Sequence, residues 1–231
     1  MIKQLMLVLA VMLVGCKSEG STTPYSDAKL EGIRGRVKSV TEVIRLSDSN
    51  VVSQRISLYD ENGYKISMES LDNELDTELL EFSSNGILKY EPYNGQQRLL
   101  KGYDYEGAVI SEATQKWSSP MAYTVVTSYA NTPSMSNTIK GALDKEGKIS
   151  SMQMIAKSGE DIQINSLTKF IYDDSGYQNG YIQKDVLAST DIKYVIMNKG
   201  YDSFGNITKQ EVYVEQSVLV SEKEITYEYY E

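Results

Sequence analysis

The chain has 231 residues, with 32 acidic against 23 basic side chains, a formal net charge of -9, one cysteine and no histidine. Histidine is the commonest general base and the usual zinc ligand, so its absence excludes Ser-His and Cys-His catalysis and makes a zinc site unexpected. The acidic balance, with no basic cluster, argues against nucleic-acid binding.

The first element in the chain is a short apolar segment. Lys3 precedes an unbroken apolar run from Leu5 to Val14. This run is shorter than the about 20 residues that span a bilayer, and it has the layout of a secretory signal. It leads into Leu13-Val14-Gly15-Cys16, which resembles the lipobox of bacterial lipoproteins. The resemblance implies a signal peptide at 1–15 and acyl chains on Cys16 that anchor the protein.

The next segment, 16–29, is predicted to be the lipidated cysteine and a flexible tether, because its residues are small and polar. Lys17 stands directly after the cysteine instead of an aspartate, which for this lipoprotein class indicates the cell outer membrane of a Gram-negative bacterium. Cys16 is the only cysteine, so no disulfide can stabilise the rest. Residues 30–231 are predicted to form a single all-β domain.

Six segments of this domain share one form, in which Asp or Ser stands three residues before Gly. They are Asp60–Gly63, Ser83–Gly86, Asp104–Gly107, Asp144–Gly147, Asp173–Gly176 and Asp202–Gly205. In a type I turn the first side chain accepts hydrogen bonds from the turn's own N–H groups, and a left-handed glycine in fourth place suits a hairpin. A large residue precedes each turn and would cover its base: Tyr59, Phe82, Tyr103, Leu143, Tyr172 and Tyr201. The motif therefore predicts hairpin tips.

The spacing of these tips predicts the number of strands. One hairpin of two eight-residue strands fills the usual interval between motif glycines, so six tips predict about 12 strands. Alternating stretches such as Met121–Tyr129 fit this pattern. Tyr129–Pro133 reads as a degraded copy of the turn, and Ser47–Asn50 as the turn of an additional pair.

Segment 71–82 supports two interpretations. Leu71, Leu75 and Leu79 stand at helical spacing with acidic residues between them. Glu78–Phe82, however, leads directly into a predicted hairpin tip, which favours strand-turn-strand. Both interpretations stay open.

The turn motif also carries a resemblance. Tyr201, Asp202, Gly205 and Asn206 complete the sequence Tyr-Asp-x-x-Gly-Asn, which resembles the YD repeat of RHS-type proteins. The copies that begin at Tyr59, Tyr103 and Tyr172 lack the Asn. The opening Gly35–Glu42 is similar to the start of short YD-repeat lipoproteins of Gram-negative bacteria, some of which are described as having a porin-like β-barrel. The resemblance implies hairpin-built sheets and carries over no catalytic residue.

The fold must bury one apolar sheet face without a partner domain. We expect an antiparallel up-and-down meander of about 12 strands, closed or strongly curled into a barrel, with a β-sandwich or an open curved sheet as the alternative. A transmembrane barrel is not expected. Arg55, Lys209 and Glu211 lie in mid-strand, where a lipid-facing surface needs apolar bands.

Carboxylates provide few candidates for chemistry. Glu74 with Asp76, or Glu222 with Glu224, could serve a glycan hydrolase, but these acid-rich stretches are typical of solvated faces. The turn aspartates could bind calcium. Their type and spacing are already explained by the turns, so no metal and no cofactor is predicted.

Aromatic residues provide the predicted binding positions. The chain has 18 Tyr against 3 Phe and 1 Trp, and rings on a rigid sheet can stack on sugars or partner side chains. Trp117, beside a proline loop, and the nearby Tyr123 are the predicted binding residues. The run Tyr227, Tyr229 and Tyr230 is predicted to close the sheet.

Together these features predict an envelope protein that is attached to the membrane by its N-terminal lipid. Its β-domain is expected to be non-enzymatic and to bind a glycan or an envelope protein, or to serve as a scaffold. The alternative is a carboxylate-based glycan hydrolase at the cell envelope.

Overall fold

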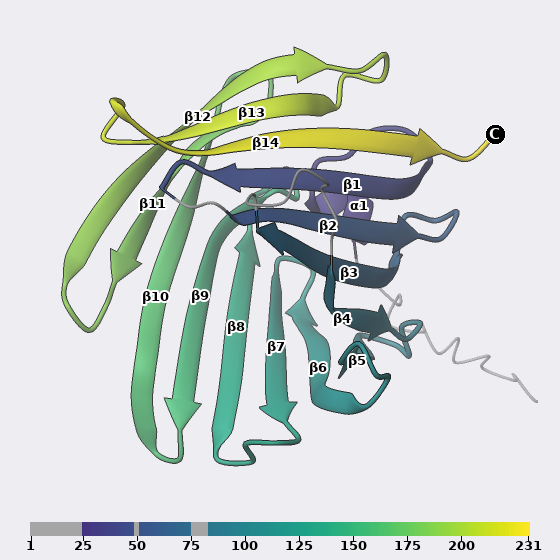
Figure 1. Cartoon of the computed structure of the whole chain (residues 1–231), viewed down its shortest axis with the longest axis vertical. Coiled ribbons are helices and arrows are strands. Elements are labelled where there is room, and N and C mark those ends of the chain that lie inside the picture. Colours follow the sequence, from purple (N-terminus) through teal and green to yellow (C-terminus); the bar gives the residue numbers. More distant parts are fainter. Residues whose placement is uncertain (1–24, 49–50, 75–82) are drawn as a thin grey trace, which may run out of the picture.

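The computed structural model describes residues 25–48, 51–74 and 83–231. In these residues an antiparallel sheet of 14 strands closes into a barrel. Each strand pairs with its neighbours in the chain, and β1 (Val37–Leu46) completes the circle by pairing with β14 (Val218–Tyr229). The predicted all-β meander closed into a barrel is confirmed, with two strands more than expected (Figure 1). The sandwich and open-sheet alternatives are wrong.

The other elements follow in chain order. The helix α1 (Asp27–Leu30) precedes β1, and between β1 and β14 lie β2 (Val51–Tyr59), β3 (Lys65–Glu74), β4 (Ser83–Tyr90), β5 (Gln97–Tyr103), β6 (Val109–Ser119), β7 (Ala122–Tyr129), β8 (Met135–Leu143), β9 (Ile149–Ser158), β10 (Asp161–Tyr172), β11 (Gln178–Asp185), β12 (Thr190–Tyr201) and β13 (Ile207–Val214). Within the described part of the chain, no helix has the length and apolar character of a membrane span.

The Asp–Gly turns have the geometry that their sequence predicts. In the β2–β3 turn, one side-chain oxygen of Asp60 accepts hydrogen bonds from the N–H groups of Asn62 and Tyr64, both at 2.9 Å. Gly63 closes the turn on the carbonyl of Asp60 and has a left-handed φ of +81°. The same bonds form at Asp104, Asp144, Asp173 and Asp202. These residues therefore define five hairpins.

The sixth predicted tip, Ser83–Gly86, is wrong. Gly86 lies within β4 and pairs with Ser70 of β3, beside a bulge. A Cβ atom built on Gly86 would stand 2.5 Å from the carbonyl oxygen of Tyr103. This glycine therefore permits close packing of strands and does not form a turn.

Segment 71–82 is settled only where the structure describes it. Residues 71–74 continue β3 and pair with β2, so the helical interpretation is wrong for them. Residues 75–82 lie outside the described chain. Tyr129–Pro133 does connect two paired strands, β7 and β8, and 47–50 lies between the paired strands β1 and β2.

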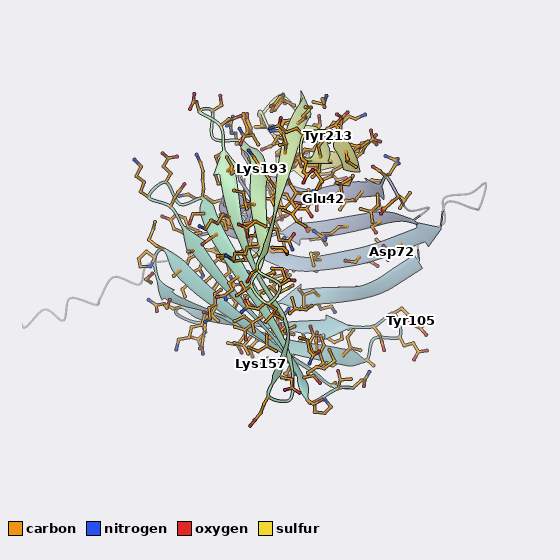
Figure 2. All side chains as sticks on the ribbon, turned by 90° about the vertical axis from the view of Figure 1, so that its left-hand side faces the viewer. Glu42, Asp72, Tyr105, Lys157, Lys193 and Tyr213 are labelled. Carbon is orange, nitrogen blue, oxygen red and sulfur yellow. The ribbon has the colours of Figure 1, made fainter. Side chains whose placement is uncertain are left out.

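The hairpins divide the barrel into two ends. Because the strands alternate in direction, the turns after even-numbered strands lie at one end, which we call the helix end since α1 lies there. Four Asp–Gly turns, after β2, β8, β10 and β12, belong to the helix end. The turn after β5 lies at the far end, where Tyr105 projects from its tip (Figure 2).

The two faces of the wall follow from strand register, because residues opposite each other in antiparallel strands share a face. Gln210 of β13 pairs with Lys223 of β14, and both line the barrel's interior, called here the lumen. Their neighbours Lys209 and Glu211 therefore lie on the outer face, as expected. Arg55, which was also assigned to the outer face, lines the lumen instead.

Candidate binding site in the barrel lumen

The segment before β1 is folded into the helix end of the barrel. Asp27 and Ala28 of α1 are buried, and Ala28 packs against Val37 and Tyr59. The predicted tether 16–29 is therefore too long, since its last residues belong to the folded domain. Residues 1–24 lie outside the described chain, so the signal peptide, with Leu13, Val14 and Gly15, and lipidation at Cys16 stay predictions.

Buried charges attach α1 to the wall. The Asp27 carboxylate pairs with the Arg98 guanidinium through two bonds of 2.6 and 2.8 Å, and it accepts a third bond from the Lys65 backbone N–H at 2.7 Å. Arg98 also donates to the Gln115 side chain at 2.8 Å. The buried carboxylate and the buried guanidinium therefore both have partners, so neither charge bears the cost of being buried unpaired.

A second ionic contact follows α1. Glu31 lies 2.5 Å from the Lys65 ammonium and accepts a 2.5 Å hydrogen bond from the Tyr59 hydroxyl. Burial alone would lower the pKa of Lys65, but the charge and hydrogen bond of Glu31 outweigh it, so the pKa is raised. Burial and the same carboxylate raise the pKa of Tyr59. Glu31, directly after α1, is thus attached to the wall at Tyr59 and Lys65.

The predicted binding residues Trp117 and Tyr123 belong to this packing. Their side chains are 3% and 9% exposed, and their ring centroids lie 5.1 Å apart. Tyr25 and Leu30 cover them from the N-terminal segment, and the Trp117 indole donates to the Tyr93 hydroxyl at 3.2 Å. A stacking role needs an exposed ring face, so the structure gives these two rings a core role in place of the predicted one.

A cavity of about 600 Å³ remains in the lumen beside the N-terminal segment. One side of it is charged. Glu42 of β1 lies 2.9 Å from the Lys223 ammonium and 3.5 Å from the Arg55 guanidinium. Burial raises the pKa of Glu42, but the charge and hydrogen bond of Lys223, with Arg55 adding, outweigh it and the pKa is lowered.

The opposite side of the cavity is aromatic. Phe170 and Tyr172 of β10 and Tyr177 of the next turn line it. Beyond the cavity the rings continue along the same inner face, because Phe170 pairs with Tyr181 and Tyr181 pairs with Tyr194. Their ring centroids are 6.5 and 4.5 Å apart, and the last two rings are stacked. The lumen thus combines charges with flat apolar faces.

A second hollow, of about 560 Å³, lies at the helix end between the β2–β3 turn and the loop before β5. Tyr64, Tyr90 and Tyr93 line it, and Tyr64 contacts Tyr93 edge to face at 5.6 Å. The Arg98 guanidinium stands over the rings of Tyr90 and Tyr93. Since that guanidinium already pairs with Asp27, the hollow offers mainly ring surface.

Of the carboxylates considered for a hydrolase, Glu222 and Glu224 line neither hollow. Glu222 and Glu224 lie on the outer face, where Glu224 pairs with Arg45 at 3.4 Å. Glu74 ends β3, and Asp76 lies outside the described residues. In the described residues no three acidic, cysteine or histidine side chains form a group that could hold a metal ion.

Sequence reasoning missed several residues of the lumen. Ile225, Tyr227 and Tyr229 alternate with polar residues along β14, and Ile225 and Tyr227 line the lumen. One further step of the same alternation reaches Lys223. Glu42 gave no signal of its own, since a single acidic residue in a strand is usually solvated.

Comparison with known proteins finds similarity in fold only. The sequence matches no protein-family model and no curated protein. Among solved structures, a porin-like protein from Bacteroides vulgatus superposes with a TM-score of 0.53 at 10% identity, covering 83% of this chain and 98% of that one. A porin-like protein from Bacteroides uniformis gives 0.50 at 10% identity, covering 84% and 99%. The chain therefore has a porin-like barrel fold.

Proposed function

We propose that this chain is a lipid-anchored protein of the outer membrane whose non-enzymatic β-barrel binds a small ligand in the lumen. The observation that carries the proposal is the cavity of about 600 Å³ between the charged and aromatic sides of the lumen. Its size falls in the range of about 300 to 1,000 Å³ that holds small molecules. A barrel that served only as a scaffold would gain stability by filling this space with apolar side chains.

The anchor has a geometric consequence. Nine residue-to-residue steps separate Cys16 from Tyr25, and a chain of that length reaches at most about 30 Å. Tyr25 packs on Trp117 at the helix end, so acyl chains on Cys16 would turn the helix end toward the lipid. Charged residues such as Lys209 and Glu211 in mid-strand on the outer face favour a barrel that stands beside the bilayer.

The repeat motif gives this proposal its family context. The Tyr-Asp-x-x-Gly turns and the lipobox together favour kinship with the short YD-repeat lipoproteins. The porin-like fold of the neighbours agrees with the barrel described for some of them. The lumen is accessible to a small ligand whether the barrel faces the periplasm or the cell surface.

Ligand binding is tested with the full mature chain against a mixed panel of small neutral, cationic and anionic metabolites, by ligand-observed NMR. Gln210→Trp places an indole in the lumen and should abolish binding. Thr226→Trp is the matched control, because Thr226 pairs with Thr41 on the outer face, and it should bind as the native chain does. No binding by the native chain, or equal binding by both variants, would refute the proposal.

The anchor is tested separately. Cys16→Ser should move the protein from the membrane fraction to the soluble fraction, because the thiol that receives the lipid is gone. A variant that stays membrane-bound after a high-salt wash would contradict the anchor. This result is independent of ligand binding, which needs only the folded barrel.

A further inference from the structure

The residues that line the lumen cavity have a net positive charge, whereas the chain as a whole has a net negative charge. The cavity is lined by six basic residues, Lys29, Arg34, Arg55, Lys65, Lys148 and Lys223, and by three acidic residues, Glu31, Glu42 and Glu146. The chain as a whole has 32 acidic and 23 basic residues. A concave surface of one sign with low-dielectric walls concentrates ions of the other sign.

The ion pairs of the cavity leave some of its basic side chains without a carboxylate of their own. Glu31 pairs with Lys65, Glu146 with Lys148, and Glu42 with Lys223. Arg55 reaches Glu42 only at 3.5 Å and keeps 46% of its side chain exposed. One carboxylate therefore serves two cations, and part of the Arg55 charge is available to a ligand.

Two other cations of the cavity face rings. The Arg34 guanidinium stands 4.8 Å from the centroid of Tyr177, and the Lys29 ammonium stands 4.4 Å from the centroid of Tyr25. Neither forms an ion pair with any carboxylate of the described residues. Their charge is partly compensated by ring faces, which attract cations less strongly than a carboxylate does.

The aromatic side of the cavity restricts the shape of the ligand. Phe170 and Tyr172 present ring surface across from Arg55 and Lys223. A flat or chair-shaped six-membered ring could lie on such a surface while an acidic substituent reaches the cations. Gln210, between the two sides on β13, adds a hydrogen-bonding group for hydroxyls.

We propose that the lumen takes a small anionic ligand, a carboxylate carried on a six-membered ring. This inference rests on the proposed function, since it assigns the ligand class of the same cavity. Two sources share this chemistry, namely an acidic sugar and an aromatic acid, and the ring surface accepts both.

The test compares matched acids and neutral molecules by isothermal titration calorimetry. Galacturonate is compared with galactose, and benzoate with benzamide, each with the full mature chain. At least one acid should bind, and its neutral counterpart should bind about tenfold or more weakly. Galacturonate binding alone identifies a sugar ligand, and benzoate binding alone an aromatic one; either supports the inference.

Three variants assign the effect to the lumen. Arg55→Gln should weaken binding of the acid about three- to tenfold, and Glu42→Gln should strengthen it by a similar factor, because a competing carboxylate is removed. Lys209→Gln is the matched control, since it removes the same charge from the outer face, and it should bind as the native chain does. Thermal unfolding of each variant verifies that the barrel is folded.

The results that overturn this inference differ from those that overturn the proposed function. Equal affinity for each acid and its neutral counterpart, or equal weakening by Arg55→Gln and Lys209→Gln, would refute an anionic ligand. A neutral molecule that binds and is blocked by Gln210→Trp would leave lumen binding intact and refute only the charge assignment. Absence of any lumen ligand would refute both.

Discussion

Asp27 and Arg98 form a two-bond ion pair inside the barrel, 71 positions apart in the chain. The Arg98 side chain is 2% exposed and that of Asp27 is 11% exposed. Because α1 has only four residues, its own backbone bonds cannot hold it in place. The pair therefore attaches the N-terminal segment to the wall. This attachment also fixes the position of one side of the lumen.

Asp27→Asn should destabilise the protein by about 3 to 5 kcal/mol, because it leaves the Arg98 guanidinium buried without its counter-charge. Glu61→Gln is the comparison, since its ion pair with Arg36 is 69% and 55% exposed. The exposed pair should contribute less than about 1 kcal/mol. Denaturant unfolding measures both. Similar costs for the two variants would show that α1 is not held by this charge.

Asn206→Ala should destabilise the helix end by about 2 to 3 kcal/mol. The Asn206 amide donates to the Arg34 carbonyl at 2.9 Å, and its oxygen accepts from the Arg34 N–H at 2.7 Å. The effect should come from these bonds, because Ala108 occupies the equivalent position of the β5–β6 turn without breaking it. Faster hydrogen exchange at the Arg34 amide would verify the prediction, and unchanged exchange would contradict it.

Gly107→Ala should cost about 1 to 2 kcal/mol. No atom stands within 4 Å of a Cβ built there, and φ is +86°, so the penalty comes from the left-handed backbone alone. Gly107→Asn should cost less, because asparagine tolerates this conformation. Glu106→Ala in the same turn should stay within about 0.5 kcal/mol. If the Gly107→Ala variant had the same denaturant midpoint as the native chain, the left-handed backbone at this turn would be disproved.

Alkaline pH should destabilise the barrel through its buried tyrosines. Burial raises the pKa of Tyr123 to about 12, and burial with the Asp144 charge raises the pKa of Tyr172 to about 12. In the unfolded chain a tyrosine has a pKa of about 10. The unfolded state therefore loses its protons first, so this stability is complete below pH 10 and is lost as pH rises toward 12.

Denaturant midpoints between pH 8 and pH 12 measure this loss. Tyr172→Phe should make the decline shallower, because one such tyrosine no longer ionises. Tyr105→Phe, at a side chain that is 76% exposed, should leave the decline unchanged. Parallel curves for the native chain and Tyr172→Phe would contradict the assignment.

The five Asp–Gly hairpin tips were predictable because their signals are local. Asp202 and Gly205 lie three residues apart and make the turn by themselves, without help from the rest of the fold. Hairpins with other turns were harder to count. The β13–β14 connection places Glu215 and Gln216 at positive φ without a glycine, so its sequence carried no familiar turn signal.

The N-terminal segment was not predictable from its composition. Residues 17–26 are small and polar, as tethers are, and Asp27 is polar too. The burial of Asp27 depends on Arg98, which also donates to Gln115, and these side chains come together only when the barrel has formed. The lumen was missed for the same reason, since Glu42 and Lys223 are 181 positions apart and meet only through closure.

The seam between β1 and β14 also determines when folding can finish. Val40 pairs with Tyr227 and Ile44 with Lys223, so the last strand of the barrel closes on the first. Contacts this distant in sequence form slowly, since a long loop must be ordered before they stabilise the fold. Until then two unpaired strand edges are exposed, and edges of this kind recruit other chains. A truncated chain that lacks β14 would thus be the aggregation-prone form of this protein.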